Sequence, residues 1–79
     1  MDNGQKLRSI VAAILQVAEE DVDDSLSPDK VDTWDSLNHI NLLGALEQEF
    51  GVRFEAENLE KSQSIPALKE LLAKNGVSI

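Results

Sequence analysis

The chain has 79 residues, of which 42% are hydrophobic, and it contains no cysteine. This length suits one small domain with a modest core, and the lack of cysteine excludes disulfide bonds, thiolate nucleophiles and cysteine-based zinc sites. Fifteen acidic residues against seven basic ones give a formal net charge of −8, which argues against nucleic-acid binding and favours partners with basic surfaces.

No segment has the layout of a signal peptide, and no apolar run reaches membrane-spanning length. A chain without cysteine also suits a reducing compartment. We therefore expect one domain over residues 1–79 that is monomeric, cytoplasmic and not inserted in a membrane.

The first amphipathic segment runs from about Gln5 to Ala18. Apolar side chains recur there at helical spacing, which predicts a helix with one wide buried face. These side chains are Leu7, Ile10, Val11, Ile14 and Leu15, with Val17 and Ala18 extending the stripe.

Residues 19–32 have a different character, with seven acids, one proline and no helical period. This composition predicts a long loop, which is often functional inside a compact domain. Val22, Leu26 and Val31 are spaced as anchors of the loop on the core.

The loop also resembles an EF-hand calcium loop in part, and the matching positions are Asp21, Asp23, Ser25, Asp29 and Asp32. However, Leu26 stands where the motif needs glycine, and Asp32 replaces the bidentate glutamate. These mismatches favour a solvated acidic loop over a calcium site.

The strongest amphipathic pattern covers residues 38–50 and follows Thr33-Trp34-Asp35-Ser36-Leu37. At 100° per residue, its apolar side is formed by Ile40, Leu42, Leu43, Leu46 and Phe50. We predict that Ser36 is the N-cap of this helix and that Leu37 is exposed beside it.

Two further side chains in this region have structural interpretations. His39 falls in the apolar sector, so we expect a residue at the edge of the core with a satisfied ring nitrogen. Trp34 is expected to pack the loop onto the core.

The remainder of the chain predicts one minor and one principal helix. Gly51 ends the central helix, and Val52-Arg53-Phe54 forms a short extended link with its apolar residues inward. A minor helix is predicted over 55–60. Ser64 and Pro66 then begin a last helix that ends at Asn75-Gly76. Its inner face is formed by Ile65, Leu68, Leu71 and Leu72.

The predicted fold is therefore all-α: a small four-helix bundle of three principal helices and one short helix, with a long loop between the first two. Such a bundle has few means of catalysis. His39 lies three residues after Ser36, but nothing predicts an oxyanion hole, a substrate cleft or a glycine-rich phosphate loop. We expect a protein that is not an enzyme.

Asp35-Ser36-Leu37, the apolar positions after it and the end Ala45-Leu46-Glu47-Gln48-Glu49-Phe50 resemble the centre of an acyl carrier protein. The resemblance covers nearly the whole chain. It implies that Ser36 carries 4′-phosphopantetheine, donated from coenzyme A by a separate phosphopantetheinyl transferase that uses magnesium. The arm ends in a thiol that carries acyl groups as thioesters. Asp35 would help the transferase to recognise the serine; its structural alternative, a second capping group for the helix dipole, is compatible with that role.

The resemblance also implies partners: an acyl-loading ligase or transferase, and a ketosynthase or other acyl-processing enzymes of fatty acid, polyketide or related biosynthesis. The residues expected to meet them are Asp35, Leu37, Asn38, Asn41, Gly44, Glu47 and Gln48. Carriers of fatty-acid synthesis usually have acids where Asn38, Asn41 and Gln48 stand, and a bulky apolar residue in place of Gly44. We therefore expect a specialised carrier.

The family sequesters acyl chains between its helices, and the candidate lining here is Leu43, Leu46, Ala67 and Leu71. An alternative function stays open at this point. An acidic helical adaptor without any prosthetic arm would also bind a basic partner, and its binding would weaken with salt and with charge removal at Glu47 and Glu49.

Overall fold

The computed structural model describes residues 2–54 and 63–79. These residues form α1 (Asn3–Leu15), the short 3-10 helix η1 (Glu19–Asp21), α2 (Ser36–Phe50) and α3 (Ile65–Lys74), with no strand within the two described ranges. The all-α fold and the long loop between the first two principal helices are confirmed. The minor helix predicted over 55–60 lies outside the described residues.

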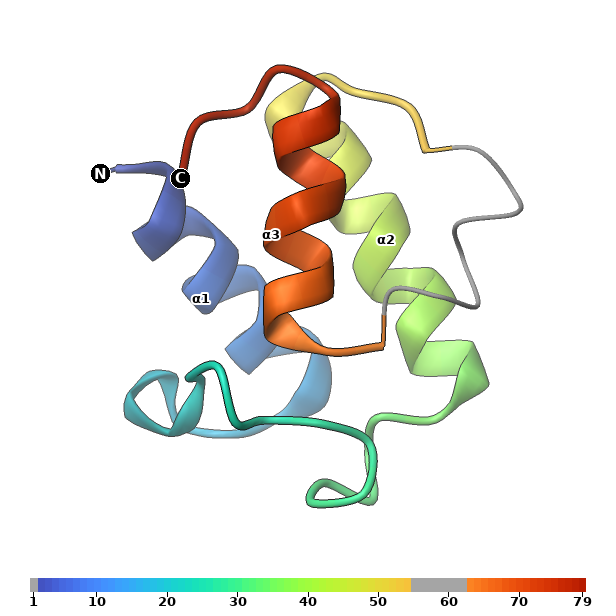
Figure 1. Ribbon diagram of the computed structural model, residues 1–79. Helices are drawn as coiled ribbons and strands as arrows, with labels where there is room; N and C mark the ends of the chain where they lie inside the picture. The colour runs from blue at the N-terminus through green and yellow to red at the C-terminus, as the bar shows by residue number, and fades with distance from the viewer. Residues whose placement is uncertain (1, 55–62) are drawn as a thin grey trace.

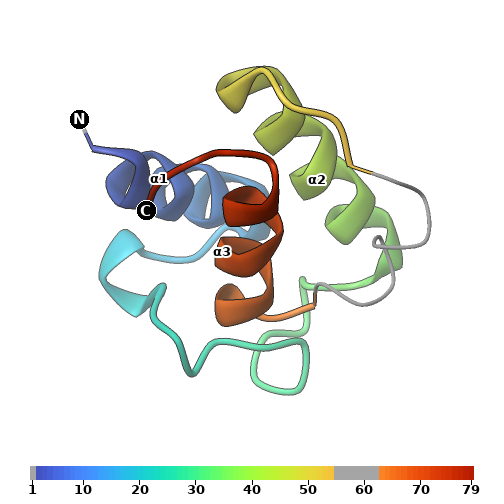
Figure 2. The ribbon, with the colours of Figure 1, turned by 45° about the horizontal axis from the view of Figure 1, so that its top comes forward.

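The three helices enclose one core. α1 and α2 pack directly against each other, and α3 lies against the pair, with the long loop crossing one end of the bundle (Figures 1 and 2). α1, α2, α3 and the loop all supply buried apolar side chains. The largest of those that are fully buried are Leu7, Val11, Leu15, Leu42, Leu43, Leu46, Leu68 and Leu72.

The first helix is shifted relative to the prediction of Gln5 to Ala18, which is wrong at both ends. Its N-cap is Asp2, whose side chain accepts a hydrogen bond from the Gln5 N–H, so the helix begins earlier. Gln16 adopts the left-handed conformation at φ 58° and ends the helix. Val17 therefore packs against the core from outside the helix.

The loop is fixed at several points along its length. Val22 and Leu26 are buried and Val31 is partly buried against the core, so the predicted anchors are confirmed. The Thr33 hydroxyl donates to the Leu15 carbonyl oxygen at 2.7 Å and ties the end of the loop to the last turn of α1. The end of the loop and the end of α1 are therefore held together just before α2 begins.

The second half of the fold agrees with the sequence pattern. Gly51 ends α2 at φ 65°, and Val52 and Phe54 pack partly buried against the core. Ser64 caps α3, with Pro66 in the first turn. The predicted inner face is buried in full: Ile65, Leu68, Leu71 and Leu72.

The two chain ends lie beside each other (Figure 1), and the Asn3 side-chain amide donates to the Ser78 carbonyl oxygen at 2.8 Å. Among the helices of the described ranges, none has both the length and the apolar character needed to cross a membrane.

Candidate functional site

The start of α2 is capped by Asp35. This residue has extended backbone (φ −99°, ψ −178°), and its Oδ1 accepts from the Asn38 N–H at 2.8 Å. The prediction that Ser36 is the N-cap is therefore wrong, because Ser36 is the first residue of the helix itself. Aspartate and serine cap about equally well, but the carboxylate also interacts favourably with the positive end of the helix dipole.

Because Asp35 caps the helix, the Ser36 hydroxyl is not needed as its N-cap. Ser36 is exposed, and no hydrogen bond within residues 2–54 and 63–79 engages its Oγ. The first N–H groups of a helix have no acceptor inside the helix, so an anion attached to this oxygen would lie in a favourable field.

Four residues on either side of Ser36 are bonded in pairs. The Asn38 side-chain amide donates to the Thr33 carbonyl oxygen at 2.7 Å. The Trp34 indole Nε1–H donates to Nδ1 of His39 at 3.0 Å, with the ring centroids 6.1 Å apart. Trp34 is 3% exposed and His39 2%. The predictions that Trp34 packs the loop onto the core and that His39 has a satisfied ring nitrogen are confirmed, but His39 is almost completely buried and does not lie at the edge of the core.

The exposed surface of α2 contains one residue that the pattern assigned to the core. Leu37 is 68% exposed, as predicted, but Ile40 is 55% exposed and its assignment to the apolar side is wrong. The buried face is centred on His39, Leu43 and Leu46. Ile40 follows His39 by 100° around the helix and so falls at the margin of that face.

Apart from Asp35, which is exposed and caps α2, the predicted recognition residues separate into two groups. Leu37, Asn41, Gly44 and Gln48 are exposed, and with Ile40 they form what we call the exposed strip. A side chain at Gly44 would meet nothing within 4 Å, so no packing contact requires glycine there.

Asn38 and Glu47 are instead half-buried and engaged within the chain. Asn38 bonds to Thr33, and the Glu47 Oε2 accepts from the Phe54 N–H at 3.0 Å. The spacing of Asn38 and Glu47 on the helix carried no signal for these roles, because both partners lie outside α2.

The candidate acyl-chain lining is packed in the core. Leu43, Leu46 and Leu71 are buried, and Ala67 is half-buried. Its role as a lining stays a prediction that requires the core to open, and movement of the NMR signals of these residues on acylation would test it. Unchanged signals would contradict it.

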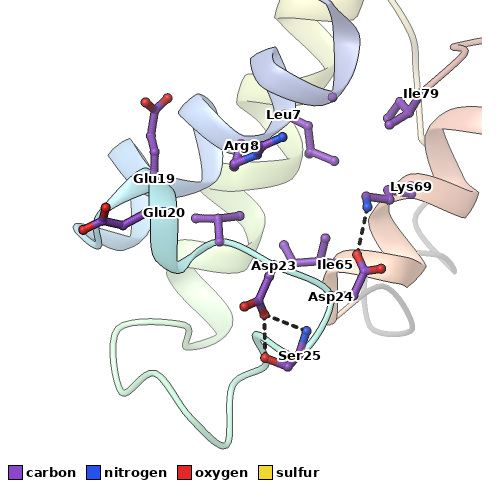
Figure 3. Close-up of a pocket in the computed structure, with 12 residues that line it drawn as sticks. Leu7, Arg8, Glu19, Glu20, Asp23, Asp24, Ser25, Ile65, Lys69 and Ile79 are labelled. Carbon is purple, nitrogen blue, oxygen red and sulfur yellow. Dashed lines mark hydrogen bonds and ion pairs between the residues drawn. The ribbon is translucent and has the colours of Figure 1, made fainter.

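A cavity of about 720 Å³ lies elsewhere, between α1, the loop and the start of α3 (Figure 3). Leu7, Ile65 and Ile79 supply apolar lining, and the Lys69 Nζ–Asp24 ion pair at 2.8 Å spans one side. Sequence reasoning did not find this cavity, because its walls come from segments far apart in the chain.

Among the acids of the loop, Asp24 pairs with Lys69 of α3 and Glu19 accepts from the Ser9 hydroxyl of α1, whereas Asp23 is bonded within the loop. The hydroxyl and N–H of Ser25 both donate to Asp23, and these hydrogen bonds hold the pKa of the Asp23 carboxyl below its ordinary value of 3.8. In the part of the chain that the structure describes, no group of three or more His, Asp or Glu side chains is arranged to hold a metal ion.

One comparison with known proteins bears on this site. A family model described as "phosphopantetheine attachment site" matches residues 5–72, a range that contains the start of α2 and most of the bundle. No curated protein matched the chain.

Proposed function

Because this chain belongs to the phosphopantetheine attachment-site family, whose members are non-catalytic carriers of 4′-phosphopantetheine, we propose that Ser36 is the residue that holds the group. The observation that carries this proposal is the free, exposed hydroxyl of Ser36 on the first residue of α2, inside the matched range. When bound, the group supplies a terminal thiol, which this cysteine-free chain lacks, for carrying acyl groups as thioesters.

The residues at the start of α2 fit such a group. Ser36 projects its oxygen from the positive end of a 15-residue helix, where a phosphodiester is favoured. Asp35 uses one carboxylate oxygen to cap the helix and is itself exposed. Its other oxygen is therefore available to the magnesium ion of an approaching transferase.

The attachment reaction balances with coenzyme A as the donor. The Oγ of Ser36 attacks the phosphorus that bears pantetheine, and its proton passes to a base of the transferase. The bond from that phosphorus to the bridging oxygen of the diphosphate breaks. Adenosine 3′,5′-bisphosphate leaves, and the chain keeps a phosphodiester on Ser36.

The direct test is the mass of the intact protein after incubation with coenzyme A, magnesium and a phosphopantetheinyl transferase of broad acceptor range. We expect the gain of one phosphopantetheine, complete loss of that gain in Ser36→Ala, and full gain in the matched control Ser64→Ala. If several transferases add nothing to the folded chain, Ser36 is not an attachment residue and the acidic adaptor becomes the better account.

The partners of a carrier must contact the surface around Ser36, and we propose that the exposed strip is that surface. It places two large apolar side chains, Leu37 and Ile40, beside the amides of Asn41 and Gln48. Recognition would then rely on apolar contact and hydrogen bonds more than on long-range charge. This chemistry supports acyl-processing enzymes of a specialised fatty acid, polyketide or related pathway as partners.

Single alanine substitutions at Leu37 and Ile40 test the exposed strip. Truncating an anchor in an interface costs more than about 1 kcal/mol, so we expect KM of the partner enzyme for the loaded carrier to rise about fivefold or more. Both sites are exposed, so the free energy of unfolding should change by less than about 0.5 kcal/mol. Ile79→Ala, at a residue that is 48% exposed and far from α2 in sequence, is the matched control. Equal KM values for all three variants would contradict the proposal.

A further inference from the structure

The residues that flank Ser36 and Leu37 are joined by two side-chain hydrogen bonds, Trp34 to His39 and Asn38 to Thr33. We propose that these four residues form a clamp that positions Ser36 for modification, with the Trp34–His39 bond as its buried part. In this clamp Trp34 and His39 are positioning residues and do not touch the reacting atoms. The inference rests on the proposed function of Ser36.

The two hydrogen bonds of the clamp join residues that flank the serine in the chain. Two successive residues before the cap are each bonded to a residue in the first turn of α2. Thr33 is bonded in addition to the end of α1 through its hydroxyl, so the clamp connects two helices. Ser36 and Leu37 lie between these fixed points.

The hydrogen bond between Trp34 and His39 can have only one donor, the indole N–H. An indole N–H can only donate, so Nδ1 of His39 must be the unprotonated nitrogen and the imidazole is neutral with its proton on Nε2. Both rings are almost completely buried, so removing either partner leaves a polar group of the other without this bond in a site that water does not reach.

How firmly Ser36 is held in one conformation depends on the residues of the clamp. Ser36 and Leu37 are exposed and have little packing of their own. The ends of helices open locally when their first N–H groups lose support. Without the clamp the first turn would lose two of the hydrogen bonds that support it, and a smaller fraction of molecules would present Ser36 in the conformation that a transferase binds.

Amide hydrogen exchange on the full chain without its prosthetic group tests the clamp independently of modification. The reporters are the N–H groups of Asn38 and His39, which bond to the Asp35 side chain and carbonyl. We expect their protection to fall about tenfold in Trp34→Phe, and the Asn38 protection to fall as far in His39→Leu. In the double variant the losses should be less than additive, since each single change already removes the Trp34–His39 bond.

Two further variants separate positioning from general stability. His39→Asn places a carbonyl oxygen close to the position of Nδ1 and should restore most of the Asn38 protection. Val11→Ala, a buried change on α1 away from the clamp, should lower global stability and leave the relative protection of the first turn unchanged. The indole N–H signal of the single tryptophan should exchange faster in His39→Leu and slow again in His39→Asn.

Transferase kinetics complete the test. We expect KM for the variants without the bond to rise about fivefold with kcat nearly unchanged, because the enzyme meets fewer presented molecules. If wild type is modified and Trp34→Phe shows unchanged KM and unchanged protection, the clamp is overturned while the proposed function stands. If protection falls as expected but no transferase modifies wild type, the proposed function fails, and with it the role of the clamp in modification.

Discussion

Two serines stand at the starts of two helices in this protein, and they have opposite roles. Ser64 is the N-cap of α3, is half-buried, and its Oγ accepts from the Ala67 N–H at 3.2 Å. Ser36 is the first residue of α2, is exposed, and leaves capping to Asp35. A displacement of the cap by one residue thus decides whether a serine hydroxyl serves the fold or is free for chemistry.

The residues that follow the two serines also differ in exposure. The residue after Ser64 is Ile65, which is buried in the core, whereas the residue after Ser36 is Leu37, which faces solvent. Ser64 follows Gln63, which caps helices poorly, so Ser64 itself must accept a hydrogen bond from the first N–H groups of α3. The comparison indicates that the aspartate before Ser36 has a structural use in addition to any role in recognition.

Among the substitutions that test the comparison of the two serines, Asp35→Ala is expected to have the largest effect on stability. Removing a charged cap that is bonded at 2.8 Å should lower the free energy of unfolding by about 1–2 kcal/mol. Ser36 would then be the nearest side chain able to cap the helix and would take on the role of Ser64. Urea unfolding measures the stability, and the rate of mass gain with a transferase measures the lost availability of the hydroxyl.

Asp35→Asn separates capping from charge in the same experiment. Asparagine caps as well as aspartate, so stability should stay within about 0.5 kcal/mol of wild type, whereas any contact between the carboxylate and the transferase metal is lost. Asp32→Ala, at an exposed acid three residues earlier, controls for the change in net charge. Equal stability of Asp35→Ala and Asp32→Ala would contradict the capping role of Asp35.

A smaller effect is expected when the two serines are truncated in parallel. Ser64→Ala should cost about 1 kcal/mol because the N-cap bond of α3 is lost. Ser36→Ala should cost less than about 0.5 kcal/mol, because it removes an exposed hydroxyl that caps nothing. Parallel denaturant curves decide the matter. Should the loss be larger for Ser36→Ala, that serine would be carrying out the structural task that we assign to Asp35.

Several features of the fold and the site could be predicted from residue patterns alone. The inner face of α3, the loop anchors Val22 and Leu26 and the helix end at Gly51 all follow from local spacing or from the conformational freedom of glycine. The exposed position of Leu37 follows from the same helical angle, since it points away from the centre of the apolar side. Each of these features depends on residues close together in the chain.

Other features depended on partners that the sequence does not place. Asp35 and Ser36 cap helices about equally well, so their order in the chain could not decide between them. Ile40 lies near the margin of the apolar sector of α2, where burial depends on whether another element covers it. The buried bond between Trp34 and His39 likewise required the loop to fold back on the helix.

The sequence by itself determined the small helical fold, because helical periodicity is a local property, and its resemblance to acyl carrier proteins indicated the carrier role of the Asp-Ser-Leu segment. Only the tertiary structure decided that Asp35 caps α2, that the Ser36 hydroxyl is left exposed, and that Trp34 and His39 bond to each other across this segment. The reason is physical: the caps and buried hydrogen bonds that settle these roles form only when the end of the loop is held against α1 and α2 at once.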